Sequence, residues 1–185
     1  MKFYKLLQDF NNDAHTLLLK INQKSFGFNR YDADRGIWFD NWTKNIKIDF
    51  IREEGDVLDD YVANNLAWFV VSDKFKKLLE QFELGKIQFL PLYAVSEDGK
   101  EKIDNIYLCN ICNLSDALNL ENSTYFGSGD NIRIAKYALN EAKIDNYDIF
   151  RLKKHVFSIF ISEQLMKAMK KDKITGCDYG NVKMI

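Results

Sequence analysis

The amino-acid sequence predicts an α+β fold, in which a mostly antiparallel sheet packs against two or three helices within a single domain. The 185 residues are 46% hydrophobic and 14% aromatic, which is a composition that can build a core. Short apolar segments with strand character outnumber the segments with helical spacing. The chain has one proline and nine scattered glycines, so no linker divides residues 1–185 into separate units.

The segment 67–82 predicts a strand followed directly by a helix. AWFVV at 67–71 is a short apolar run, typical of a buried strand. Ser72 is a favourable N-cap, and Gly85 can end the helix. Between them, one apolar stripe follows the helical spacing i, i+3, i+4, i+7: Phe75, Leu78, Leu79 and Phe82.

Two further pairs of apolar runs predict hairpins. Residues 87–95 and 105–114 flank the turn sequence EDGK at 97–100. Pro91 has no amide hydrogen to donate, so it predicts an edge position or a bulge in the first of these strands. Residues 149–152 and 156–161 predict a second hairpin, which turns at Lys153–His155.

The second helix is expected after residue 162. Ser162 is its N-cap, Gly176 is a stop signal, and a short strand is expected near 177–184. The apolar face of this helix consists of Leu165, Met166, Ala168 and Met169. Strands are also expected at 2–7, 47–51 and 132–139, whereas 11–45, 52–60 and 115–131 are interpreted as loops with short elements.

Charge and composition exclude several classes of protein. The net charge of −1 is not that of a general nucleic-acid binder. No apolar run reaches the length of a membrane span, and the first residues are too polar for a signal peptide. Three cysteines do not make a disulfide framework. We therefore expect a cytoplasmic protein that binds neither nucleic acid nor membrane.

No motif predicts catalysis, a metal site or a cofactor. Cys109 and Cys112 lack a second ligand pair, so they are interpreted as ordinary cysteines, at least one of them in the core. Neither His15 nor His155 lies in a nucleophile signature. The sequence GSGD at 127–130 lacks the lysine of a phosphate-binding loop.

The charge is unevenly distributed along the chain. Residues 31–60 contain nine acidic and four basic side chains, whereas 151–175 contain seven basic and two acidic ones. The acidic stretch is either a solvated loop or a docking surface for a basic partner. Trp38 and Trp42 flank Asp40 and either pack internally or anchor a partner. Trp68 lies in an apolar run and is expected in the core.

The motifs at 66–179 resemble immunity protein family 11 of bacterial polymorphic-toxin systems. The resemblance rests on a strand–serine–acid–helix unit at Trp68–Phe82, on NLSDAL at 113–118, and on IFRL at 149–152. A second strand–serine–helix unit, which closes on Thr175–Gly176, completes it. Residues 1–60 carry no feature of this resemblance. It implies a small cytoplasmic protein that is encoded beside a toxin and neutralises it by direct binding.

The leading hypothesis is therefore an immunity protein, without catalytic residues, that binds a cognate toxin domain encoded by a neighbouring gene. We expect a monomer or a weak homo-oligomer. The alternatives are an enzyme that reverses a toxin's modification and a scaffold subunit of a larger assembly. The candidate toxin-binding residues combine the tryptophans and the acids: Trp38, Asp40, Trp42, Glu53, Glu54, Asp56, Asp59 and Asp60.

Overall fold

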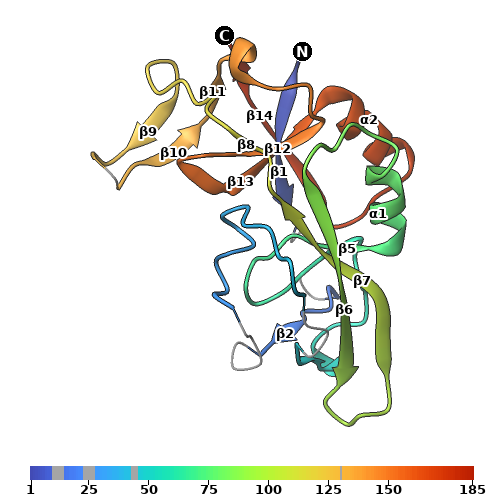
Figure 1. Cartoon of the computed structure of the whole chain (residues 1–185). Coiled ribbons are helices and arrows are strands. Elements are labelled where there is room, and N and C mark those ends of the chain that lie inside the picture. Colours follow the sequence, from blue (N-terminus) through green and yellow to red (C-terminus); the bar gives the residue numbers. More distant parts are fainter. Residues whose placement is uncertain (10–14, 23–27, 43–45, 130) are drawn as a thin grey trace.

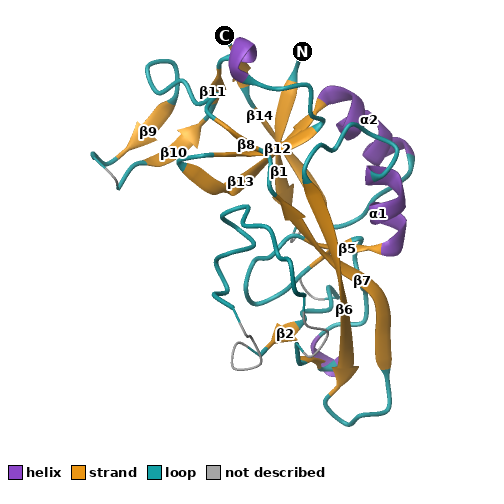
Figure 2. Cartoon of the chain, in the orientation of Figure 1, coloured by secondary structure: helices purple, strands orange, loops and turns teal. Residues whose placement is uncertain are grey.

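The computed structural model describes residues 1–9, 15–22, 28–42, 46–129 and 131–185. Strands dominate the described chain, and two α-helices lie side by side (Figure 2). They are α1 (Asp73–Leu79) and α2 (Glu163–Lys171). The architecture is therefore α+β, with a low helix content. The strands divide between two main sheets, whereas the sequence predicted one.

The first main sheet has five strands in the order β14-β1-β13-β12-β8. The pairings are antiparallel except for β12 with β8. The strand bounds are Cys177–Asn181 (β14), Phe3–Gln8 (β1), His155–Ser162 (β13), Ile149–Leu152 (β12) and Leu114–Ser115 (β8). The expected strand near the N-terminus is thus confirmed, and it lies between two strands from the other end of the sequence (Figure 1).

The second main sheet has six strands in the order β2-β3-β6-β7-β5-β4. The bounds are Lys20–Ile21 (β2), Ile48–Phe50 (β3), Ile87–Ser96 (β6), Lys102–Ile111 (β7), Val70–Ser72 (β5) and Tyr61–Val62 (β4). The hairpin of β6 and β7 confirms the pairing expected across residues 97–100. Short 3-10 turns cover Arg52–Glu54 and Glu141–Lys143.

Pro91 lies where the sequence predicted it, on an open edge close to a bulge. On the side away from β7, β6 pairs with β3 only at Val95 and Ser96. Pro91 is therefore on a stretch of β6 with no described strand on that side. The register of β6 against β7 shifts between Leu92 and Ala94.

Both helices begin at the serines that the sequence indicated. The hydroxyl of Ser72 accepts a hydrogen bond from the amide of Phe75, and that of Ser162 accepts one from Leu165, each at 3.1 Å. Helix α1 ends at Leu79, so it is shorter than the predicted helix, whose apolar stripe reached Phe82. The next two amides, of residues 81 and 82, bond to carbonyls three residues back and form tight turns instead.

Two predicted strands are wrong in their extent. The run 67–71 becomes a strand only at Val70, because Ala67 has a φ of 56° and the Asn64 side chain binds the backbone of Trp68. The run 132–139 divides into β10 (Arg133–Lys136), which pairs with β9 (Thr124–Phe126), and β11 (Ala138–Leu139). Strand β11 pairs in parallel with β15 (Lys183–Met184).

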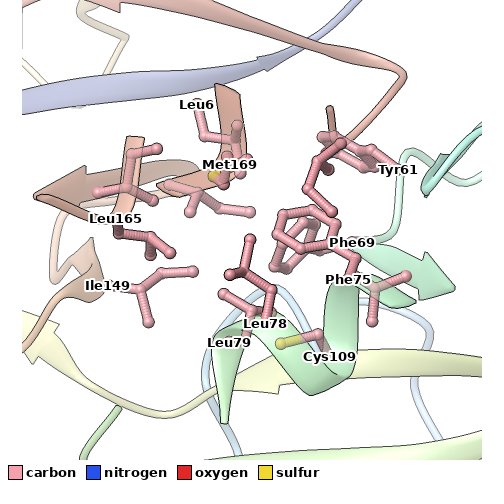
Figure 3. Packing of buried hydrophobic residues seen from close by; sticks show 14 of the residues in the cluster. Leu6, Tyr61, Phe69, Phe75, Leu78, Leu79, Cys109, Ile149, Leu165 and Met169 are labelled. Carbon is pink, nitrogen blue, oxygen red and sulfur yellow. The ribbon is translucent and has the colours of Figure 1, made fainter. Parts of the chain in front are cut away.

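The two main sheets and both helices share one core. Cys109 comes from the six-stranded sheet, and Phe69 directly precedes β5 of that sheet. Ile149 comes from the five-stranded sheet, and Phe75 and Leu165 come from the helices. Their side chains point toward one another in Figure 3. A second cluster, which includes Trp68, covers the other face of the six-stranded sheet, and a third, which includes Phe3, covers the other face of the five-stranded sheet.

Candidate partner-binding surface

Trp38 is held in an exposed position beside β6. Its side chain is 42% exposed, and the ammonium group of Lys86 lies 5.6 Å from its ring centroid. The next residue is fixed, because the Gln88 side chain accepts from the amide of Phe39 at 3.0 Å and donates to its carbonyl at 2.8 Å. An exposed tryptophan on a fixed backbone is a suitable anchor for a protein partner. Asp40, two residues further on, is also exposed.

Trp42 is a packing residue. Its indole nitrogen donates a hydrogen bond to the carbonyl of Pro91 at 3.0 Å, on the open edge of β6. Its ring contacts those of Phe28 and Phe39, with centroids 5.3 and 5.4 Å apart. This aromatic group packs on the second core cluster. Trp42 therefore helps to position the segment that carries Trp38.

Of the five predicted acids between residues 53 and 60, three are exposed. Glu53 and Glu54 lie in the 3-10 turn that follows β3, and Asp56 lies just beyond it. Glu54 pairs with Lys20 at 2.9 Å, and Asp56 lies 3.6 Å from a ring nitrogen of His15. Such exposed pairs contribute little to stability, so these carboxylates can exchange partners at small cost.

The other two acids form internal contacts, so the interpretation of 52–60 as a solvated loop fails for them. Asp59 is 6% exposed and accepts a hydrogen bond from the Thr16 hydroxyl at 3.2 Å. The Asp60 carboxylate accepts from the Ser72 hydroxyl at 2.6 Å, from Lys74 at 2.9 Å and from the Thr175 amide at 3.1 Å. Asp60 thereby joins the start of α1 to the segment after α2.

Trp38 and the exposed acids lie beside different points of strand β6, to which neither belongs. Phe39 is bound to Gln88, whereas Phe50, which precedes the acids, pairs with Ser96. Eight residues of extended strand separate these two points, a distance of roughly 25 Å. A standard protein interface covers about 800 Å² on each partner, which is a patch roughly 30 Å across, so one partner can contact both groups.

Sequence reasoning missed two exposed aromatic residues and one buried ion pair. Phe126 on β9 is 67% exposed, and Phe157 on β13 is 69% exposed. Phe126 had a signal, since it is an aromatic residue in a polar, glycine-containing segment, as Trp38 is. Phe157 had none, because it lies within the mostly apolar run 156–161 of β13. The pair of Arg151 with Asp34 joins residues more than a hundred positions apart.

The cysteines are placed as ordinary core and near-core residues. Cys109 is fully buried, which confirms that at least one of the pair lies in the core, and Cys112 is half-buried. Burial raises the pKa of both thiols, which disfavours the reactive thiolate. Within the part of the chain that the structure describes, no group of three or more His, Cys, Asp or Glu side chains could hold a metal ion.

The fold and surface together define an α+β protein in which Trp38 lies beside the open stretch of β6, and exposed acids follow β3, which pairs with the end of β6. None of its described helices is long and apolar enough to cross a membrane. The chain matches the family described as Immunity protein family (Imm11) over residues 2–184, and it belongs to that family. The match includes residues 1–60 almost entirely, so a resemblance limited to 66–179 was too narrow. No curated protein matches the chain.

Proposed function

We propose that the protein neutralises a toxin domain of a polymorphic-toxin system, encoded by a neighbouring gene, by binding to it directly in the cytoplasm. Membership of the immunity family over residues 2–184 is the observation that carries this proposal. The protein acts as a stoichiometric inhibitor and needs no cofactor. In solution it is a monomer or a weak homo-oligomer.

The contact surface combines one aromatic anchor with exposed acids. Trp38 and Asp40 contact the toxin near the start of β6, and Glu53, Glu54 and Asp56 contact it near the end of that strand. The acids steer a basic toxin surface to the site, because opposite charges accelerate encounter. Trp42, Asp59 and Asp60 support this surface from inside, since their polar groups already have partners within the protein.

The first test is co-expression of the protein with the toxin encoded beside its gene, with growth rescue and co-purification as readouts. The variant Glu53→Lys/Glu54→Lys/Asp56→Lys should weaken binding by about tenfold or more at low salt, and by less at high salt. The matched control is Glu121→Lys/Asp145→Lys/Asp172→Lys, which makes the same charge change at exposed acids elsewhere. Equal toxin affinity of the two variants would reject the acidic surface.

The aromatic anchor is tested separately. Trp38→Ala should weaken toxin binding by roughly thirtyfold, as expected for a central tryptophan of an interface. Phe157→Ala is the control, because it removes an aromatic side chain that is at least as exposed. Unchanged affinity of the Trp38 variant would remove that residue from the contact surface.

The alternative functions differ in the amount of protein needed to block the toxin and in the size of the free protein in solution. A binding inhibitor abolishes toxin activity only when the two proteins reach equimolar amounts. An enzyme that reverses a toxin's modification would protect at a small fraction of that amount. A scaffold subunit would migrate in a larger assembly without the toxin. Titration of toxin activity, together with light scattering of the free protein, separates the three.

A further inference from the structure

A pocket of about 620 Å³ opens on the five-stranded sheet, at the end opposite the acidic residues. Its lining comes from β1, β14, the end of β10 and the start of β15. Lys5, Lys136 and Lys183 all line it, and no acidic residue does. We call it the three-lysine pocket. Figure 1 shows where these strands lie, with β1 and β14 near the centre of the view and β10 to the left.

The pocket exists because the cover of the sheet ends there. Alternation along β1 places Phe3, Lys5 and Leu7 on one face. Phe3 is buried in the third core cluster, whereas Lys5 and Leu7 extend beyond it and line the pocket. Gly180 of β14 lies opposite Lys5 and has no side chain to fill the space. The pocket floor is therefore formed by backbone and by the stem of Lys5.

The cations of the pocket have no acidic partner of their own. Lys5 places its ammonium group 5.2 Å from the ring centroid of Tyr137, and partial burial lowers the pKa of this lysine. The ammonium group of Lys183 donates to the side-chain oxygen of Asn122 at 2.9 Å. Among the described residues, no ion pair involves Lys5, Lys136 or Lys183. Burial removes water from the ammonium group of Lys5, and an anion in the pocket would compensate for that lost hydration.

The other lining residues favour a carboxylate on a hydrocarbon stem. Leu7, Ala135 and Val182 give the pocket apolar walls, which fit the methylene groups of a glutamate side chain. Asp178 of β14 lies opposite Leu7 but is not part of the pocket lining, and its carboxylate accepts a hydrogen bond from the amide of Tyr179. A phosphate backbone would gain little from apolar walls, and the net charge of −1 disfavours nucleic acid.

We propose that the three-lysine pocket receives an acidic segment of the toxin domain, with one glutamate or aspartate side chain inserted between Lys5, Lys136 and Lys183. This inference rests on the proposed function and adds a second contact, of opposite charge to the first. The two contacts together require a toxin surface that is basic in one region and acidic in another. They fix the orientation of the bound toxin, because exchanging the two regions would bring like charges together.

The first experiment measures binding of a short labelled peptide of alternating Glu and Leu by fluorescence anisotropy. The triple variant Lys5→Gln/Lys136→Gln/Lys183→Gln should bind it about tenfold more weakly than the unaltered protein. The matched control, Lys153→Gln/Lys154→Gln/Lys171→Gln, removes three exposed charges elsewhere and should change affinity less than about twofold. An equal loss of peptide affinity in both variants would show that the peptide does not bind in the three-lysine pocket.

Gly180→Val tests the pocket without changing any charge. A Cβ at Gly180 would lie 3.5 Å from the Cβ of Lys5 and 3.6 Å from Leu7, which is ordinary contact. The Cβ of the valine therefore fits the strand, and we expect its two methyl groups to take up space on the pocket floor. We expect unchanged thermal stability and a severalfold loss of peptide binding. Unchanged peptide binding in this variant would overturn the proposal even if the triple variant failed to fold.

The same variants are then tested with the neighbouring-gene toxin domain and with single-stranded DNA. Loss of toxin affinity in the triple variant, but not in its control, supports the inference. Equal toxin binding by the unaltered protein and by all three variants would overturn the role of the pocket while the proposed function stands. Toxin that binds none of them, the unaltered protein included, overturns the proposed function and the named occupant together. DNA binding that depends on the three lysines would overturn the assignment to a protein partner.

Discussion

The guanidinium group of Arg151 lies 3.8 Å from the carboxylate of Asp34, and both residues are buried, at 3% and 6% exposure. Arg151 belongs to β12, whereas Asp34 belongs to the turn that precedes Trp38. Arg151 also donates to the carbonyl of Val156 at 2.6 Å. The pair therefore attaches the segment of the aromatic anchor to the five-stranded sheet.

Arg151→Met should lower the free energy of unfolding by about 3 kcal/mol or more, because it leaves the Asp34 carboxyl buried without its cation. Denaturation in urea measures this loss. The double variant Asp34→Leu/Arg151→Met should be more stable than the single one, since it removes the stranded charge as well. A double variant that is less stable than Arg151→Met would contradict this account.

Asp34 should also give the protein a pH-dependent stability. Burial raises the pKa of this carboxyl from 3.8 to about 6, against the opposing charges of Arg151 and Arg30. Between these values the folded state keeps a proton that the unfolded state has lost. The free energy of unfolding should therefore fall, by at most about 3 kcal/mol, as the pH rises from about 4 to about 6.

The Asp34→Asn variant isolates this effect. Other groups contribute equally to both proteins, so the difference between their unfolding free energies should change over the same pH window and stay constant above it. Chemical denaturation at several pH values between about 4 and 7 measures the difference. A difference that is independent of pH would show that the folded and unfolded carboxyl share one pKa.

The two capping serines should differ in their contribution. Ser72→Ala removes the cap of α1 and should cost about 1 kcal/mol. Both serines also donate to a carboxylate, Ser72 to Asp60 and Ser162 to Asp148. Ser162→Ala should cost more, roughly 2–3 kcal/mol, because Ser162 is fully buried whereas Ser72 is half-buried, so water cannot replace the lost donor. Thermal melts of both variants give the comparison. Equal costs would contradict an effect of burial, and would fit compensation by Gln164, which also donates to Asp148.

Gly176→Ala should destabilise the protein more than Gly99→Ala. Both glycines have nearly the same positive φ, 73° and 72°, so the backbone strain of an added side chain is the same. A Cβ at Gly176 would lie 2.7 Å from the carbonyl oxygen of Tyr61, whereas one at Gly99 would meet nothing within 4 Å. The difference in unfolding free energy therefore measures the close approach alone, and similar values would contradict it.

Local sequence signals predicted the local structure well. Ser72 and Ser162 mark their helices because capping depends on residues one turn apart. The turn at 97–100 and the position of Pro91 followed from backbone chemistry within one hairpin. The division into two sheets had no such signal, since β1 pairs with residues more than 150 positions away. The interruption of the run 67–71 depends on the Asn64 side chain, which periodicity does not register.

The candidate surface was predicted less completely, because charge counting does not indicate burial. Glu53 and Asp60 are equivalent in composition, yet Glu53 is exposed whereas Asp60 holds together three segments of the chain. Trp38 and Trp42 likewise differ because only Trp42 meets the open carbonyl of Pro91. The three-lysine pocket could not be anticipated, since Lys5, Lys136 and Lys183 meet only in the folded chain.

The position of β1 between β13 and β14 affects how soon a new molecule can act. This strand emerges from the ribosome some 150–180 residues before its neighbours. At roughly 5–20 residues per second, β1 waits about ten to thirty seconds for them. During that interval the side chains of Phe3 and Leu6 cannot be buried, because the strands that pair with β1 have not been made. Under the proposed function, a cell that relies on newly made copies would lack protection during each delay, so a standing reserve of folded protein would be the safer defence.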